Sequence, residues 1–458
     1  MQSAVVKKLK CPAGAAFGAK MLRKARQMAC YTFFLARAVA QASASTHHVA
    51  MEKNNTGPLA GLKVIEMGTL IAGPFCGRLL AEFGAEVIKI ETPADDDGSG
   101  GDPLRKWRKL HDDGEEKTSL WWYAQSRNKK SVTVNLREKD GQEIVRKLAA
   151  NADILVENFR PGTLEKWNLG YEALAAVNPK LIMVRLSGFG QTGPYKDRVG
   201  FGAIGESMGG IRYLTGYPDR APVRVGISLG DSLAAMYGAM GALMALHHRH
   251  KTGKGQMVDV ALYEAVFSLM ESMLPEFGMT GFVRERTGSS LPGIVPSNTY
   301  LCGDGQYVVI GANGDSIFKR MMLAIGRADL ANDAALADNA GRTARTDELD
   351  TAIGAWTGAN TLAQVLDVLD KADVPSGRIY SIADIVADMQ YQARGMIEKH
   401  QLGDNKEILL PGIVPKLSDT PGGTKWLGPT LGAHTAEVLN VIGYDVKAQA
   451  ELKRRGII

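Results

Sequence analysis

Cysteine is scarce in this chain, with four residues among 458, and none of them forms a CxxC pair or a histidine-linked metal spacing. This pattern is typical of proteins from a reducing compartment, so we expect neither a disulfide nor a metal site. Long apolar runs are also missing: none reaches about 18 residues, and we therefore expect no transmembrane helix. The remaining composition, 45% hydrophobic and 22% charged, is that of an ordinary globular protein.

Acidic residues are absent from the first 51 positions, whereas eight lysines and arginines lie there. The net charge of +5 arises in this segment and the remainder is close to neutral, which argues against a nucleic-acid partner. The segment is typical of a mitochondrial transit peptide, and the alternative is a mis-set start before Met51 in a bacterial protein. We favour a cytoplasmic location over the mitochondrial matrix. In both cases we expect residues 1–57 to be a disordered basic extension without a role in the mature fold.

Strand and helix patterns alternate from about residue 60 onward. Five short apolar runs predict strands, at residues 63–67, 86–90, 131–136, 153–156 and 181–186. Amphipathic spacing predicts helices at 74–83 and 140–150. The alternation indicates an α/β fold with an open, mostly parallel sheet that helices cover on both faces. Such a sheet binds ligands beyond the carboxyl ends of its strands.

The composition and the pattern of expected elements change beyond about residue 275. Residues 288–296 are rich in Gly, Pro and Ser, residues 307–310 are typical of a strand, and amphipathic helical patterns follow to about residue 390. We therefore predict a smaller α+β domain over residues 276–400.

A single carboxylate, Asp231, follows a glycine and precedes an almost uncharged stretch at 233–247. The pattern predicts a strand-like approach, a flexible Gly230 and a long helix that ends in cationic residues before Gly253. Asp231 would be the N-cap residue, where free N–H groups and the helix dipole favour its ionised form. An ionised, positioned carboxylate is a candidate covalent nucleophile. The local pattern alone favours a simpler interpretation, in which Asp231 only caps the helix.

Two short nucleophile or cofactor patterns compete with this interpretation. Residues 226–230 match the GxSxG elbow of α/β-hydrolases, with Ser228 as nucleophile and His434 suitably placed in the chain order. No HGGG oxyanion loop precedes the match, and such patterns arise by chance among 52 glycines. A thioesterase that uses Ser228 remains an alternative. The turn at 68–74 lacks GxGxxG and ends in Pro74, which argues against a dinucleotide-dependent oxidoreductase.

Nine separated motifs occur in one order over roughly residues 58–458. They are LKVIE at 62–66, AGP at 72–74, LAEFGAEVIKIE at 80–91, NKKS at 128–131, DILVENFRPG at 153–162, SGFGQTGP at 187–194, GD at 230–231, KTGKGQ at 251–256 and LGAHT at 431–435. In this set the chain resembles the class III CoA-transferases, the family of formyl-CoA, carnitine and bile-acid CoA-transferases. The number of independent motifs makes the resemblance more specific than either short pattern above.

The resemblance implies a large Rossmann-like CoA-binding domain, whose first part is 58–275 and whose C-terminal return is 401–458, with the small domain inserted between them. It also implies two chains interlocked as an obligate homodimer. The aspartate at the position of Asp231 attacks the donor thioester, forms a mixed anhydride and then an aspartyl-CoA thioester, which the acceptor carboxylate attacks. We therefore predict a CoA-transferase (EC 2.8.3) that uses CoA thioesters as substrates and binds no permanent cofactor, with Asp231 as nucleophile.

The resemblance further implies a set of CoA-lining positions. These positions are Leu70, Ile71, Ala72, Val134, Asn158, Arg198 and Phe201. Core packing is the alternative for the apolar members. Thr92 stands where formyl-CoA transferase has an arginine near the adenosine phosphate. A nearby basic cluster would replace that charge or form a solvated face, and it comprises Arg105, Lys106, Arg108 and Lys109.

Two further positions bear on the reaction type. Some relatives are racemases, which pair the aspartate with a histidine at the position of Phe201. Without a second proton-transfer group there, epimerisation loses its mechanism, so an α-methylacyl-CoA racemase-like activity is the weaker alternative. Residues 288–293 fall where the family has a loop over the active site, although the run of four glycines is absent. Backbone N–H groups in such a loop would stabilise an oxyanion.

The substrate pair is the least constrained part of the prediction. Four arginines lie around Asp231 in the sequence, namely Arg198, Arg212, Arg220 and Arg224. An arginine fork would hold the distal carboxylate of a dicarboxylic acid, whereas a structural or surface role is the alternative for each. We favour a succinyl-CoA donor and a small dicarboxylate acceptor, with glutarate, itaconate, malate and oxalate open.

Overall fold

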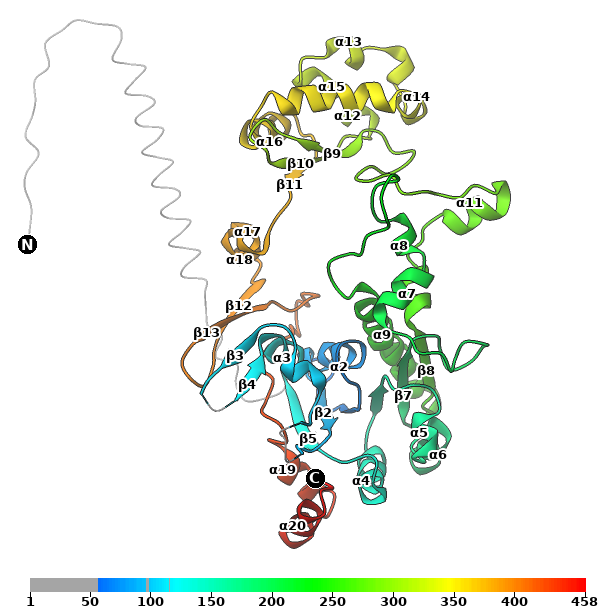
Figure 1. Ribbon diagram of the computed structural model, residues 1–458, viewed down its shortest axis with the longest axis vertical. Coiled ribbons are helices and arrows are strands. Elements are labelled where there is room, and N and C mark those ends of the chain that lie inside the picture. Colours follow the sequence, from blue (N-terminus) through cyan, green and yellow to red (C-terminus); the bar gives the residue numbers. More distant parts are fainter. Residues whose placement is uncertain (1–56, 96–98, 115) are drawn as a thin grey trace, which may run out of the picture. The chain divides into compact units, whose positions relative to one another are not determined.

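The computed structural model describes residues 57–95, 99–114 and 116–458, so residues 1–56 of the predicted basic extension lie outside the described residues. A six-stranded parallel sheet has the order β5-β2-β1-β6-β7-β8 (Figure 1). Its strands are β1 (Lys63–Glu66), β2 (Glu86–Glu91), β5 (Lys129–Thr133), β6 (Ile154–Glu157), β7 (Ile182–Ser187) and β8 (Met257–Ala261). Counted along the chain this is the 3-2-1-4-5-6 order of doubly wound sheets, which reverses between β1 and β6. The predicted α/β fold with a parallel sheet is confirmed.

Two strands differ from the sequence prediction. β5 ends at Thr133, and the apolar Val134 and Leu136 that follow it line a cavity. β8 was not predicted. It lies at the edge of the sheet, alternates exposed and half-buried residues and contains Asp259, so it lacks the continuous apolar run of a central strand.

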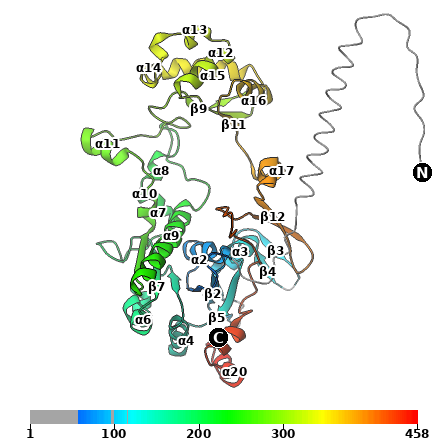
Figure 2. The ribbon, with the colours of Figure 1, turned by 180° about the vertical axis from the view of Figure 1, so that it is seen from behind.

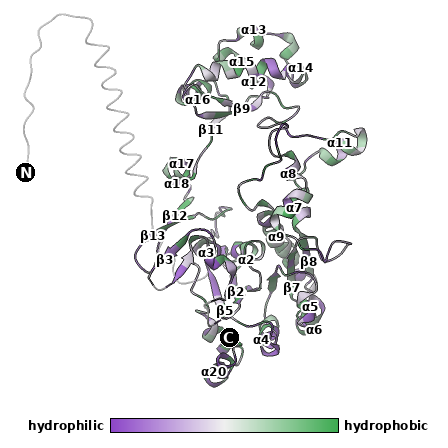
Figure 3. Cartoon of the chain, viewed as in Figure 1, coloured by the Kyte–Doolittle hydropathy of each residue, from purple (hydrophilic) through white to green (hydrophobic). Residues whose placement is uncertain are grey.

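Successive strand residues project into two cores, one on each face of the sheet. Val64 packs in the core that contains α2 (Ala72–Glu82) and α9 (Leu229–Thr252), whereas Ile65 packs in the core that contains α4 (Lys139–Ala149). Figure 3 shows the hydrophilic residues of α4, whose apolar residues are buried against the sheet. Helices therefore cover both faces, as predicted.

α9 is long and apolar enough to cross a membrane by length and composition, and it is the one such helix among the described residues. Its contacts are those of a core helix, because it packs against α2, β7 and α10 (Leu262–Phe267) (Figures 1 and 2). Small residues permit this packing: a Cβ at Gly238 would lie 3.0 Å from the Leu186 side chain. The helix ends at Gly253 in the left-handed conformation, as predicted.

A separate core lies in residues 295–374. It is built on a three-stranded antiparallel sheet, comprising β9 (Ser297–Leu301), β10 (Tyr307–Gly311) and β11 (Ser376–Arg378). The longer helices of this region are α12 (Asp315–Ala324), α15 (Thr346–Gly358) and α16 (Leu362–Lys371). The strand expected at 307–310 is confirmed, while the limits 276–400 of a small domain stay a prediction.

C-terminal residues close the outer edge of β5. The Ser131 N–H donates to His434 Nδ1 at 3.2 Å, and the Thr133 N–H donates to Thr435 Oγ1 at 2.9 Å. Burial lowers the pKa of His434, which favours the neutral ring that this acceptor role requires. These side chains therefore occupy an edge that would otherwise be open for pairing. Two helices follow and add side chains to the α4 core, namely α19 (Thr435–Val441) and α20 (Val446–Arg454).

We expect His434→Ala to lower the free energy of unfolding by about 1–2 kcal/mol, because the Ser131 N–H loses its acceptor. Urea unfolding followed by circular dichroism measures this loss, and the CoA transfer that the family resemblance implies should keep a rate within about twofold of the wild type, as expected for a residue with a structural role only. His434→Gln, which retains an acceptor oxygen, serves as the milder control. A large loss of turnover at unchanged stability would contradict this structural role.

Candidate active site

Asp231 lies in the first turn of α9, whose N-cap residue is Ser228, so the prediction of Asp231 as the N-cap is wrong. The segment before the helix is coil and not the strand-like approach that the sequence suggested. Gly230 is already helical, and a Cβ there would lie 2.9 Å from the carbonyl oxygen of Gly202. Glycine therefore serves a close approach between α9 and α7 (Gly202–Met208), and not a flexible turn.

The carboxylate of Asp231 packs against the backbone of Gly202, since a Cβ at that glycine would overlap Asp231 Oδ2. Burial and, second, the Glu206 carboxylate raise the pKa of Asp231 to about 6, while Arg224 acts in the opposite direction. At neutral pH the carboxylate is thus ionised but poorly solvated. This is the state that suits an attacking carboxylate.

A cavity of about 320 Å³ is lined by Asp231 and by segments that follow β1, β6 and β7. These segments lie at the carboxyl ends of the strands, where an open parallel sheet binds ligands. Six of the predicted CoA-lining positions line the same cavity as Asp231, namely Leu70, Ile71, Ala72, Asn158, Arg198 and Phe201. The structure therefore brings these residues together, and their contact with CoA stays a prediction.

A second cavity, of about 360 Å³, shares Thr69 and Phe159 with the first. The seventh predicted position, Val134, lines it. Trp167 also lines it and meets Phe159 edge to face, with ring centroids 5.5 Å apart. The two cavities share residues, and both lie at the strand ends. Their walls are therefore continuous across the place between β1 and β6 where the strand order reverses.

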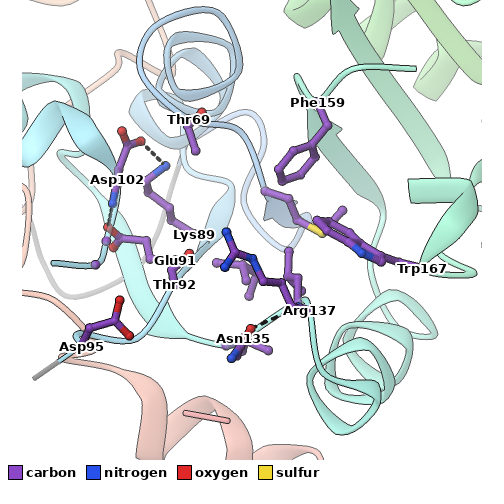
Figure 4. Close-up of a pocket in the computed structure, with 16 residues that line it drawn as sticks. Thr69, Lys89, Glu91, Thr92, Asp95, Asp102, Asn135, Arg137, Phe159 and Trp167 are labelled. Atoms are coloured by element: carbon purple, nitrogen blue, oxygen red, sulfur yellow. Dashed lines mark hydrogen bonds and ion pairs between the residues drawn. The ribbon is translucent and has the colours of Figure 1, made fainter. Parts of the chain in front are cut away.

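The second cavity is lined by the paired Lys89 and by one arginine that the sequence analysis missed. Arg137 lines this cavity, and Figure 4 shows its side chain projecting into it. Of the predicted basic cluster, Arg105 is buried and bonded to Glu91 at 2.8 Å, Arg108 lines the Asp231 cavity, and the two lysines line neither cavity. Arg137 lies three residues beyond Val134, so the rule that ligands bind beyond strand ends could have found it.

The loop after β1 is held by buried charges. Lys89 Nζ pairs with Glu66 Oε1 at 2.9 Å and with Asp102 Oδ2 at 2.8 Å, and it donates to the Gly68 carbonyl oxygen at 2.8 Å. Asp102 Oδ1 in turn accepts the Leu70 N–H at 3.0 Å. Leu70 has a φ of 63°, a left-handed conformation that is costly for leucine. The charge network therefore stabilises a strained residue in the cavity wall.

Asn158 fixes the same loop from the end of β6. Its Oδ1 accepts the Thr69 N–H at 2.8 Å, and its Nδ2 donates to the Thr69 carbonyl oxygen at 2.9 Å. A Cβ at Gly73 would lie 2.8 Å from the Cα of Gly68, so the loop and the start of α2 are in close backbone contact. Asn158 thus positions the cavity wall as well as lining it.

The four arginines predicted near the site divide into two groups. Arg198 and Arg224 line the Asp231 cavity. Arg212 instead pairs with Glu206 at 3.0 Å, and Arg220 is an exposed residue outside both cavities. Glu206 itself was missed, because nothing in its local sequence distinguishes it from a surface glutamate.

The serine-hydrolase alternative fails on geometry. Ser228 lines the Asp231 cavity, but its φ of −84° is not that of a strained nucleophile elbow. His434 lies at the edge of β5, which is two strands from β1 and four from β7, the strand against which α9 packs. Strands are spaced by about 4.8 Å, so more than about 10 Å separates this histidine from Ser228.

Three further features of the site concern the loop at 288–293, histidine in the Asp231 cavity and clusters of metal-ligating residues. Residues 288–293 line neither cavity within this chain, and the Gly288 N–H donates to the Gly216 carbonyl oxygen. The role of that loop over the active site stays a prediction. No histidine lines the Asp231 cavity, and the part of the chain that the structure describes contains no metal-site cluster of three His, Cys, Asp or Glu residues.

Comparison with known proteins gives a consistent set of relatives. A model of CoA-transferase family III matches residues 59–435. Succinyl-CoA–D-citramalate CoA-transferase of Chloroflexus aurantiacus is 50% identical over 402 residues, which are 88% of this chain and 98% of the relative. The succinyl-CoA–L-malate CoA-transferase beta subunit of the same organism is 43% identical, over 84% of this chain and 94% of the relative.

The fold has solved counterparts. The crystal structure of a CaiB/BaiF family protein from Brucella suis matches with a TM-score of 0.74 at 34% identity, over 84% of this chain and 100% of that chain. The matched family region contains Asp231 and all the predicted CoA-lining positions.

We expect Gly202→Ala to reduce catalytic turnover roughly 100-fold, because the added Cβ overlaps Asp231 Oδ2 and must displace the carboxylate of the predicted nucleophile. Steady-state kinetics and thermal unfolding of the same preparation measure this effect. Gly354→Ala is the matched control, since this helical glycine in α15 has open space around it. Turnover of Gly202→Ala within twofold of the control would contradict the placement of Asp231.

Proposed function

This chain belongs to CoA-transferase family III, and from that membership we propose that it transfers CoA from succinyl-CoA to a small dicarboxylic acid. One observation carries the proposal: Asp231, half-buried and with a raised pKa, lines a cavity that is also lined by Arg198 and Arg224. The two Chloroflexus relatives are named for a succinyl-CoA donor and for citramalate or malate. Both acids are hydroxy-dicarboxylates, which makes a four- or five-carbon hydroxy-dicarboxylate the preferred acceptor.

We propose that acyl-CoA spans both cavities. The thioester end lies in the cavity of Asp231, and the nucleotide end lies in the second cavity, where Arg137 supplies positive charge for phosphate. Phe159 and Trp167 offer apolar ring surface there for the adenine (Figure 4). The shared wall formed by Thr69 and Phe159 would contact the pantetheine arm between the two ends.

In the proposed reaction, an oxygen of Asp231 attacks the thioester carbonyl carbon, the C–S bond breaks, and CoA leaves as a thiolate from a mixed anhydride. The thiolate attacks the aspartyl carbonyl carbon, which forms an aspartyl-CoA thioester and releases succinate. The acceptor carboxylate then attacks this thioester and again expels the CoA thiolate. Attack of the thiolate on the acceptor acyl carbon gives the product and frees the Asp231 carboxylate. The cycle consumes no water, proton or electron.

Arg224 and Arg198 are proposed to bind the carboxylate that does not react. Succinyl-CoA and a dicarboxylate acceptor both present one reacting carbonyl and one free carboxylate. A guanidinium that faces Asp231 within the same cavity can therefore hold the donor and then the acceptor in turn. A monocarboxylic acid would leave this charge without a partner.

The racemase alternative has no support in the cavity. Phe201, and no histidine, lines the position where the racemases place their second base. Epimerisation needs two proton-transfer groups at the α-carbon, and Asp231 supplies one. We therefore retain transfer as the proposed activity.

We further propose the interlocked obligate homodimer with its inserted small domain. In the single chain, α9 presents a stripe of exposed apolar side chains at helical spacing. It comprises Met236, Met240, Leu243 and Met244, which are 44–63% exposed. A contiguous apolar face of this kind is typical of an interface. Light scattering at decreasing concentration should show only dimer until the protein unfolds, and a reversible native monomer would contradict the interlocked arrangement.

The nucleophile is tested by Asp231→Asn, which keeps the side-chain volume and removes the attacking charge. We expect turnover to fall by several orders of magnitude while CoA binding persists, as for loss of any covalent nucleophile. Incubation of the wild-type enzyme with succinyl-CoA and no acceptor should leave an adduct on Asp231 that hydroxylamine traps, located by peptide mass spectrometry.

Ser228→Ala is the matched control, since Ser228 lines the same cavity and is the competing nucleophile. It should retain most of the transfer activity. Near wild-type transfer by Asp231→Asn, or an acyl adduct on Ser228, would overturn the assignment.

A further inference from the structure

Glu206 is a buried acidic residue beside Asp231 that the transfer chemistry does not use. It lies on α7 and is 2% exposed. Its Oε1 is 3.5 Å from the backbone nitrogen of Gly230, in the first turn of α9. Glu206 on α7 and Asp231 on α9 therefore both lie close to the first turn of α9, and only Asp231 lines the proposed substrate cavity.

Two arginines hold Glu206, and they differ in exposure. Arg212 Nη2 lies 3.0 Å from Oε2, and Arg224 Nε lies 3.3 Å from the same oxygen. The Arg224 side chain is 46% exposed and lines the Asp231 cavity, whereas Arg212 lines neither cavity. A guanidinium has five N–H donors, so the contact with Glu206 leaves Arg224 with donors for a substrate carboxylate.

We propose that Glu206 is a positioning residue, which fixes Arg224 toward the cavity so that the enzyme selects acceptors with a second carboxylate, and which keeps Asp231 basic among the surrounding arginines. The inference rests on the proposed function. Without the Glu206 contact, Arg224 would be a half-exposed, flexible side chain, and ordering it would weaken acceptor binding.

The second part of the proposal follows from the charges around Asp231. The charged side chains that line its cavity are all arginines, namely Arg108, Arg160, Arg198 and Arg224. Such a setting favours the ionised form and weakens the basicity of a carboxylate. Burial is the main cause that raises the pKa of Asp231 to about 6, and the negative charge of Glu206, on the packed α7, adds to it and opposes Arg224. A more basic carboxylate is a stronger nucleophile while it remains ionised at neutral pH.

Glu206→Gln keeps the shape and removes the charge. We expect the KM for malate or citramalate to rise about tenfold or more, and the KM for a monocarboxylate such as butyrate to stay unchanged, because only the second carboxylate loses its fixed partner. The acidic limb of the pH profile of kcat/KM should move to lower pH by roughly half a unit to one unit, because Asp231 loses a like-charged neighbour.

The chain offers a matched control in Glu82→Gln. Glu82 is also buried between two arginines, with Arg78 at 2.6 Å and Arg127 at 2.7 Å, but it lies on α2 and lines neither cavity. This variant should lose stability without any change in acceptor preference or in the acidic limb.

Glu206→Asp separates the positioning of Arg224 from the charge effect on Asp231, since it keeps the charge but withdraws it from Arg224. It should lose acceptor preference while the acidic limb stays near that of the wild type.

The outcomes distinguish failure of the role of Glu206 from failure of the proposed function. If the wild type transfers CoA to dicarboxylates, and Glu206→Gln matches Glu82→Gln in KM ratio and acidic limb, the role of Glu206 is contradicted and the proposed function stands. If Glu206→Gln does not fold, an unchanged acceptor preference in Glu206→Asp contradicts the positioning role. A wild type that transfers CoA to no dicarboxylate contradicts the proposed function and this inference with it.

Discussion

The ion pairs that Lys89 forms with Glu66 and Asp102 are the constraint on which both cavities depend. All three side chains are buried beneath the loop that follows β1, and Asp102 also holds the strained Leu70. Lys129 adds a second contact to Glu66 at 2.7 Å. Removing one member of a buried pair costs about 3–5 kcal/mol, so the loop cannot relax without a large loss of stability. The binding surface is therefore formed before any ligand arrives, and little binding energy is spent on ordering it.

The central strands could be predicted because each is buried on both faces and forms a short apolar run, as Val64 and Ile65 illustrate. The general rule for open parallel sheets predicted a ligand site beyond the strand ends, and two cavities lie there. The N-cap of α9 lies three residues earlier than predicted, at Ser228, which is also a favoured N-cap residue type, so the local sequence offered two starts. The close approach of Gly230 to Gly202 could not be predicted, since it depends on how the two helices pack. Asp231 itself was found through the family resemblance, because a lone aspartate at a helix start has an ordinary local explanation.

Glu206 lay beyond any local pattern for a similar reason. Its partners Arg212 and Arg224 are 6 and 18 residues away, and the second lies in coil. The three side chains meet because α7, α8 (Ile211–Leu214) and the coil before α9 are packed together. Such a contact depends on how the elements pack, and the spacing of charges along the sequence does not predict it.

The edge of β5 has a consequence for the synthesis of the protein. The Asn128 N–H is bonded to the Trp426 carbonyl oxygen, and the Ser131 N–H to His434, across about 300 residues of chain. A ribosome that has finished β1, β2 and β5 must still translate most of the sequence before Trp426 and His434, which bond to the edge of β5, emerge. During that interval the nascent sheet carries an open edge, at which pairing with another chain competes with folding. Closure of this edge thus waits until the residues around His434 have left the exit tunnel, and a truncation that removes them would leave the border of β5 open.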